Sequence, residues 1–302
     1  MLDVLSRAGC FIAIIILGYA FRKKGIFKEE DFGVLSKIVI KITLPAAIVT
    51  SFAGKEIDPK LLSLALLGLG GGLLYVMIGF LLNKKQGNEA QAFGMINLAG
   101  YNIGNFTFPF VQSFLGPVGV ITTSLFDVGN AFICLGGAHS MASIVKGGGK
   151  FSLVKILKAL SKSVAFDCYI IMLFLNLLHI SLPAPVLSFA EIVAGANAFV
   201  AMLMIGVGFK LSGDRSQMGT IVKFISIRYG VALVLAVLCY TLLPFGLETR
   251  QTLVILFFSP IASAAAAYTG DLKGDTGLAS AINSISIVCS IVFILLCLLI
   301  IL

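Results

Sequence analysis

Apolar runs long enough to cross a membrane recur along the whole of this 302-residue chain. They extend from "CFIAIIILGYAF" near the start to "SIVCSIVFILLCLLIIL" at the end. A transmembrane helix needs about 20 apolar residues, and only helices or closed barrels satisfy their backbone groups in lipid. Since 59% of the residues are hydrophobic and only 12% are charged, no segment remains for a soluble domain. We therefore expect an all-α integral membrane protein.

The apolar runs and the helix breakers between them predict ten transmembrane helices. The positive cluster at residues 22–24 follows the first run instead of preceding it, which is typical of a retained span and not of a cleaved signal peptide. The predicted spans are 4–21, 34–53, 61–83, 92–115, 117–140, 163–181, 186–210, 221–244, 251–272 and 276–302.

Basic residues indicate the orientation of these spans. Fifteen Lys and Arg residues, among them Lys210 and Arg215, fall in loops that follow odd-numbered spans, and four fall on the opposite side. Cytoplasmic loops carry the excess of Lys and Arg. The pattern predicts a multi-pass protein of the cell membrane with both termini on the non-cytoplasmic side. The basic residues behind the net charge of +8 are thus expected to orient the protein in the membrane, and nucleic acid is not an expected partner.

The chain divides into two halves of five spans. A long basic loop, "MASIVKGGGKFSLVKILKALSK", separates spans five and six. We predict a first repeat over 1–145, a cytoplasmic linker over 146–162 and a second repeat over 163–302. Because five is odd, the second repeat would be inverted relative to the first.

Helix breakers recur at matching places in these halves. Pro109 lies in span four and Pro260 lies in span nine, half a chain apart. A single proline in a membrane helix usually indicates a packing kink, but corresponding interrupted spans in inverted halves indicate a transporter's central site. We predict that spans four and nine are broken helices that cross near the bilayer midplane.

Polar side chains gather at these two predicted breaks. Unpaired backbone groups must face protein, water or ligand, and polar side chains there can bind a substrate. The alternative is that they form hydrogen bonds between helices. The candidate substrate-binding residues are Tyr101, Asn102, Asn105, Thr107 and Pro109 at the first break and Ser259, Pro260 and Ser263 at the second.

Asp127 is the deepest acidic residue of the apolar spans. An ionisable group at that depth is a functional candidate, either as a proton carrier or as part of a cation site with Asn130, which lies three positions away on the same helix face. A structural pairing with Lys or with backbone donors is the alternative. Arg228 lies within span eight, and two roles are left open for its side chain. It extends to the membrane interface by snorkelling, or it attracts an anion.

Enzymatic motifs are absent from the sequence. There are two histidines and no HExxH metal motif, and the membrane protease motifs Gly-x-Gly-Asp and Gly-x-Ser-Gly do not occur. The six cysteines lie inside apolar runs without CxxC spacing, as packing residues do. We expect neither an enzyme nor a bound metal or cofactor.

The chain resembles the auxin efflux carrier family over essentially its full length. "NIGNFTFP" is similar to the family's "GNTGFLGLP", with Asn102, Gly104 and Pro109 in register and Thr107 in place of a Gly. "VIKITLPAA" aligns Pro45 with a second family segment. Pro260 matches at the second break, and "KGDTGLASAINSISIVCS" matches from Asp275 onward. The family's polar positions after that proline are Ala264 and Ala265 here.

This resemblance implies a secondary transporter or facilitator of a small organic anion, such as a dicarboxylate or an auxin-like acid. It would work by alternating access of an elevator type, with Asn102 at the anion site and H⁺ or Na⁺ as the coupling ion. The alternatives are a sodium-coupled symporter of the related bile-acid family and a membrane sensor that does not transport. Expected partners are the anion and membrane lipid, and a homodimer is one option.

Overall fold

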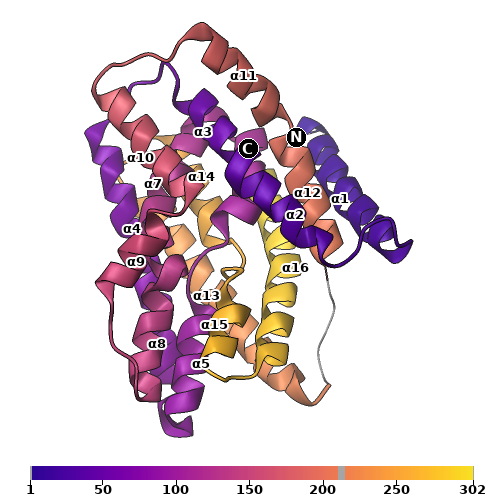
Figure 1. Cartoon of the computed structure of the whole chain (residues 1–302), viewed down its shortest axis with the longest axis vertical. Coiled ribbons are helices and arrows are strands. Elements are labelled where there is room, and N and C mark those ends of the chain that lie inside the picture. The colour runs from indigo at the N-terminus through magenta and orange to yellow at the C-terminus, as the bar shows by residue number, and fades with distance from the viewer. Residues whose placement is uncertain (1, 210–214, 302) are drawn as a thin grey trace.

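The computed structural model describes residues 2–209 and 215–301, and these form helices joined by short turns, with no strand among them (Figure 1). Lys210 lies outside the described residues. Both termini lie in the upper part of Figure 1, at the same end of the molecule. The helices are α1 (Leu2–Lys23), α2 (Asp31–Ile38), α3 (Leu44–Phe52), α4 (Ser63–Leu82), α5 (Asn88–Leu98), α6 (Phe108–Phe114), α7 (Gly116–Phe132), α8 (Ala138–Lys146), α9 (Leu153–Leu160), α10 (Val164–Leu177), α11 (Ala184–Gly195), α12 (Asn197–Gly208), α13 (Met218–Leu242), α14 (Leu247–Phe257), α15 (Ala265–Asp271) and α16 (Thr276–Ile301).

Within the described residues, seven helical stretches are long and apolar enough to cross a membrane. The pair α9 and α10, bent by 77°, gives an eighth if it is one span. The all-α membrane fold is therefore confirmed, whereas the count of ten stays a prediction. The seven stretches are Val4–Lys23, Asp31–Phe52, Pro59–Leu82, Gly116–Lys146, Ala184–Gly208, Met218–Leu242 and Thr276–Ile301.

The fourth predicted span is interrupted between α5 and α6. The chain is non-helical at residues 99–102 and resumes as a π-helical turn (Ile103–Thr107) that leads into α6. Gly100 has φ +74°, and a Cβ there would meet the Cys134 sulfur, so only glycine fits this turn. Pro109 lies at the start of α6, after the gap. The wider π-helical turn accommodates its ring and its missing N–H.

The ninth predicted span is interrupted between α14 and α15. The helix ends at Phe257 and resumes at Ala265. Pro260 lies inside this gap. Here the proline does stand where the helix stops, because it cannot donate the hydrogen bond that would continue it.

A third interruption, in the fifth span, was not predicted. A π-helical turn (Ile133–Gly137) separates α7 from α8, and Gly136 within it has φ +135°. The fully buried Ile156 of α9 packs against Gly136. The adjacent glycines in "LGGAH" were the sequence signal for this turn. It places α9, which falls in the predicted linker, directly against the broken helix.

Glycines allow α4 and α7 to pack with their backbones in contact. A Cβ on Gly68 would meet the carbonyl of Phe126, and a Cβ on Gly129 would meet the carbonyl of Ala65. In lipid the hydrophobic effect does not hold helices together, and close packing through small residues does so instead. The packing fixes the position of α7, which carries Asp127 and Asn130.

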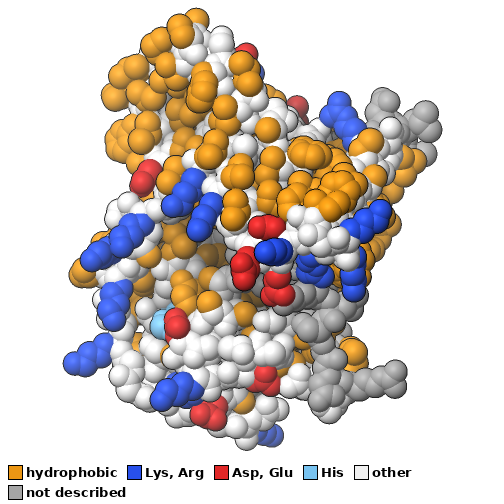
Figure 2. Space-filling view, turned by 45° about the vertical axis from the view of Figure 1, so that its right-hand side comes forward, with side chains coloured by type: hydrophobic (Ala, Val, Ile, Leu, Met, Phe, Trp, Pro, Cys, Tyr) orange, Lys and Arg blue, Asp and Glu red, His pale blue; other side chains and the backbone are white. Residues whose placement is uncertain are grey.

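The surface separates apolar from charged regions. Figure 2 shows hydrophobic side chains over the upper part of one face, with Lys and Arg mostly across its middle and lower parts. Large apolar side chains are exposed on the protein, such as those of Ile192 and Phe189 in α11. Such a surface is stable in lipid and not in water.

Candidate functional site

The two broken helices meet at their breaks. The Asn102 backbone N–H donates to the Pro260 carbonyl over 2.9 Å. The Thr107 hydroxyl donates to the Ser259 hydroxyl over 2.7 Å, and both side chains are fully buried. The residues that form these bonds are about 150 positions apart in the chain. The predicted contact between the two breaks is therefore present in the structure.

Asn130 of α7 satisfies the backbone of the first break. Its side-chain oxygen accepts from the Tyr101 N–H at 2.9 Å, and its side-chain nitrogen donates to the Tyr101 carbonyl at 2.8 Å. The same nitrogen donates to Asp127 at 2.8 Å. The Asn130 side chain is 1% exposed, so this amide is committed to holding the break and has no free surface for a substrate.

Polar residues of α16 satisfy the second break in the same manner. The Asn283 side chain donates to the Ala262 carbonyl at 3.2 Å, and the Ser286 hydroxyl accepts from the Ile261 N–H at 3.2 Å. Each break is thus supported by the second helix after it in the chain, α7 for the first break and α16 for the second. Asn283 and Ser286 were not predicted as site residues, although both lie in the quoted "ASAINSISIVCS" segment.

Arg228 of α13 joins the two breaks from a third direction. Its guanidinium donates to the Leu98 carbonyl at 2.8 Å and to the Ser259 carbonyl at 3.1 Å. The side chain has no exposed surface, so snorkelling does not describe it. The sequence signal was a charge deep in an apolar span, but nothing in the sequence identified its partners.

A cavity of about 150 Å³ lies against the crossing. We call it the crossing cavity. A second cavity of about 170 Å³, the α16 cavity, shares the residues Asn102, Asn105 and Ser263 with it. The crossing cavity is lined from α7 by Asp127 and Asn130 and from the second break by Ala262, Ser263 and Ala264.

Asn102 lies where these two cavities meet. Its side chain is half-buried, and its amide forms no hydrogen bond within the described residues. The nearby Asn105 side chain accepts a hydrogen bond from Ser36 at 3.1 Å, and Ser263 is exposed to the cavities. Among the predicted residues, Asn102 therefore offers an amide with both donor and acceptor free.

The other predicted residues hold the crossing together. Tyr101 is 1% exposed and packs edge-on against Phe126 and Phe257, so it contributes mainly its backbone to the cavity. Thr107 and Ser259 bond to each other. Pro109 is buried in α6, and Pro260 contributes its carbonyl to Asn102. These five residues are located beside the site, and their side chains are packed inside protein.

Asp127 lies in the wall of the crossing cavity with both carboxylate oxygens engaged. One oxygen accepts from Asn130, and the other accepts from the Tyr169 hydroxyl at 3.1 Å. No Lys or Arg forms an ion pair with it in the described part of the chain. A charge held by neutral donors next to a cavity can take up a proton or a cation.

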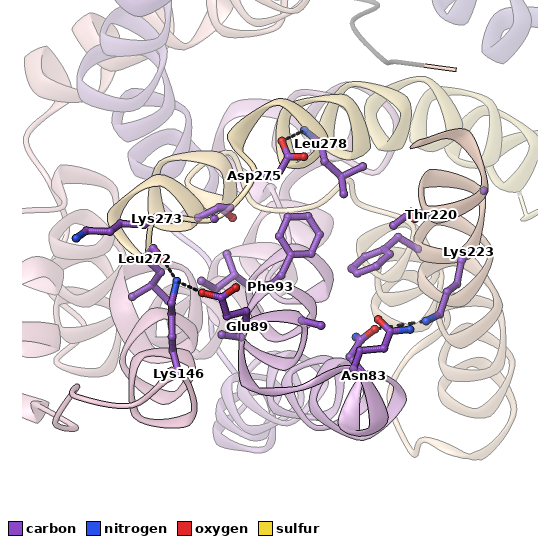
Figure 3. Close-up of a pocket in the computed structure, with 18 residues that line it drawn as sticks. Asn83, Glu89, Phe93, Lys146, Thr220, Lys223, Leu272, Lys273, Asp275 and Leu278 are labelled. Atoms are coloured by element: carbon purple, nitrogen blue, oxygen red, sulfur yellow. Dashed lines mark hydrogen bonds and ion pairs between the residues drawn. The ribbon is translucent and has the colours of Figure 1, made fainter. Parts of the chain in front are cut away.

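A larger cavity of about 530 Å³ lies between α5, α13 and the turn from α15 to α16 (Figure 3). Lys146 forms an ion pair with Glu89 at 3.2 Å and donates to the Leu272 carbonyl. Lys223 donates to Asn83 at 3.4 Å on the opposite side. In this cavity Lys146 is paired with Glu89 and Lys223 bonds to a neutral amide, whereas the crossing cavity contains the Asn102 amide without a hydrogen bond to the described residues.

The described residues contain no group of three or more His, Cys, Asp or Glu side chains placed to hold a metal ion. The cysteines are free thiols.

Comparison with known proteins agrees with this architecture. A family model described as membrane transport protein matches residues 10–302. The chain is also 23% identical over 126 residues to a protein of Methanothermobacter thermautotrophicus described as an uncharacterized transporter; this match covers 40% of the chain and 42% of that protein. Membership in a transporter family implies a protein that is not an enzyme. The chain belongs to the membrane transport protein family, the family of the auxin efflux carriers.

Proposed function

We propose that this membrane transporter carries a small organic anion with a carboxylate group through the crossing of the two broken helices. The observation that carries the proposal is the free amide of Asn102 at the meeting point of two cavities. An amide donor recognises a carboxylate without the desolvation penalty of a buried cation. Asn105 and Ser263 offer further polar contacts from the first and second breaks.

The polarity of the backbone supports an anionic cargo. The helical stretch 103–114 begins at the crossing cavity, and the N-terminal end of a helix carries partial positive charge. In broken-helix transporters such ends point at anionic substrate groups. Ala262 and Ala264 line the other side of the cavity, so the carboxylate would face Asn102 and an apolar part of the substrate would face the alanines.

The size of the crossing cavity supports a small cargo. Its volume of about 150 Å³ lies below the roughly 300–1,000 Å³ of pockets that enclose drug-sized ligands. A dicarboxylate of a few carbons fits this space better than a steroid acid does. This favours the organic-anion carrier over a bile-acid type of symporter.

Movement would proceed by alternating access of an elevator type, with cavities on the two sides of Asn102 opening in turn. Asp127 is the proposed coupling group, because an ionised carboxylate in the same cavity repels the anion until a proton or Na⁺ neutralises it. We place the protein in the cell membrane with both termini on the non-cytoplasmic side, as a monomer or homodimer.

Uptake by purified protein in liposomes tests the site. Asn102→Ala is expected to lower carboxylate uptake by about 10- to 100-fold, since a hydrogen bond to a charged group contributes about 1.5–3 kcal/mol. Asn88→Ala, at the exposed far end of α5, is the matched control and should transport as the parent does. If Asn102→Ala moves every tested carboxylate at the parental rate, the proposed site is wrong.

A second measurement tests coupling. In the parent, a proton or sodium gradient should drive accumulation above equilibrium, and Asp127→Asn should abolish that drive while leaving exchange down a gradient. Asp167→Asn, in the first turn of α10, is the control. Full gradient-driven accumulation by Asp127→Asn would show that Asp127 is not the coupling group.

The same measurements separate the two alternative functions. A strict sodium requirement would assign the chain to the sodium-symporter alternative. Thermal stabilisation by a ligand without any uptake would indicate a sensor.

A further inference from the structure

Arg228 brings a permanent positive charge to the ends of two half-helices. Leu98 is the last residue of α5, and Ser259 lies two residues beyond the end of α14. Both carbonyls accept from the Arg228 guanidinium, at 2.8 Å and 3.1 Å. One planar group thus binds the C-terminal ends of both helices that run into the breaks.

The guanidinium has no conventional counter-ion. No Asp or Glu side chain that the structure describes forms an ion pair with it. Its carbon lies 4.1 Å from the Tyr75 ring centre and 4.5 Å from that of Tyr101. Tyr75 also donates its hydroxyl to the Arg228 backbone carbonyl at 2.7 Å. The aromatic faces stabilise a cation that water does not reach.

The helix ends supply the missing negative charge. Each helix C-terminus is equivalent to about half an elementary negative charge, so two of them balance about one cation. In broken-helix transporters, such ends and the unwound carbonyls beside them coordinate Na⁺. We infer that Arg228 is a built-in cation that holds the two half-helix C-termini together in place of a bound alkali ion.

Arg228 therefore acts as a positioning residue for the crossing. The side chain has no exposed surface and both tyrosine rings cover it, so it does not touch a substrate in the crossing cavity. Any dependence of transport on sodium must then come from another group, and Asp127 is the candidate. The inference rests on the crossing and not on the identity of the cargo, so it is tested without transport.

Thermal unfolding of detergent-purified Arg228→Ala tests it. We expect a melting temperature about 10 °C below that of the parent. Millimolar ethylguanidinium, a free copy of the lost head group, should restore part of this loss, and choline at equal ionic strength should not. Sodium should also stabilise Arg228→Ala more than choline does, because the two carbonyls are left without a cation. If neither ethylguanidinium nor sodium stabilises Arg228→Ala more than choline does, the inference is overturned.

Arg250 offers a matched control. Its guanidinium also donates to a carbonyl, that of Tyr240 at 2.9 Å, and lies 5.6 Å from the Tyr240 ring centre. It binds only one carbonyl and is partly exposed. Arg250→Ala should lose less stability than Arg228→Ala and should show no specific response to ethylguanidinium. An equal response of both variants would overturn the assignment, because it would reflect a general effect of the additive.

Two further variants keep the test decisive if Arg228→Ala does not fold. Arg228→Lys retains the charge, and Arg228→Met retains the apolar stem without charge. The inference requires the lysine variant to melt at least about 5 °C above the methionine variant, and equal melting temperatures overturn it. A last test uses Asp127→Asn with Arg228 intact. If sodium still raises its melting temperature more than choline does, the inference is overturned, because sodium would then bind without Asp127 although Arg228 is proposed to take its place.

Discussion

Asn130→Leu should destabilise the protein strongly and stop transport. The substitution removes the only side chain within the described residues that bonds to both the N–H and the carbonyl of Tyr101. The carbonyl keeps the Ile103 N–H as a donor at 2.9 Å, so the buried Tyr101 N–H is the group that loses its partner. An unsatisfied buried group costs about 1–3 kcal/mol. It also removes one of the two donors to Asp127. We expect a fall of about 5–10 °C in melting temperature and loss of uptake in liposomes.

Two companion variants sharpen this prediction. Asn176→Leu removes an asparagine of α10 that donates to the Lys55 and Phe52 carbonyls near the surface, where water can replace it. It should change the melting temperature much less. Asn130→Asp keeps an acceptor for the Tyr101 N–H, but it loses its donors unless it is protonated. Its stability should therefore rise as the pH falls. A pH-independent Asn130→Asp, or equal losses for positions 130 and 176, would contradict the assigned role.

Gly68→Ala should force α4 away from α7. The added Cβ would meet the Phe126 carbonyl and would lie 3.2 Å from the backbone nitrogen of Asn130. The helices α4 and α7 must therefore separate. Overpacking of this kind costs about 1–3 kcal/mol. Because α7 carries Asp127, we also expect reduced uptake at temperatures where the variant remains folded.

Gly70 is the control on the same helix, two residues away. It is exposed, and an added Cβ would meet no atom within 4 Å. Gly70→Ala should leave stability unchanged or raise it by up to about 1 kcal/mol, since alanine favours the helix over glycine. The measurement is the melting temperature of both variants with uptake in liposomes. If the two alanines have the same effect, helix propensity and not the contact with α7 determines the result.

The breaks could be predicted from the sequence because their causes are local. Proline and glycine disrupt a helix wherever they occur in an apolar run, and Asp127 with Asn130 follow from spacing on one helix face. The position of Pro109 nevertheless gave the wrong place for the first gap, because a proline is tolerated in the first turn of a helix. The gap falls at Gly100, where φ is positive and where Cys134 and Ala262 from other parts of the chain leave no room for a Cβ.

The division of labour within the site could not be predicted. Asn102, Asn130 and Asn283 have the same chemistry, yet Asn102 faces two cavities while the other two hold backbone groups of the breaks. Likewise, Arg228 differs from a snorkelling arginine only through carbonyls contributed by two distant helices. Such roles arise from packing among segments that the sequence does not place relative to one another.

The bond between Asn102 and Pro260 also has a consequence for biosynthesis. A chain emerging from the ribosome inserts α5 and the first break long before Arg228, Pro260 and the polar residues of α16 exist. During that interval, the Leu98 carbonyl and the Asn102 N–H have no protein partner from the second half and must be held by water, lipid headgroups or the insertion machinery. Completion of the site is therefore one of the last events in assembly, and a truncated first half would remain unfinished at its centre.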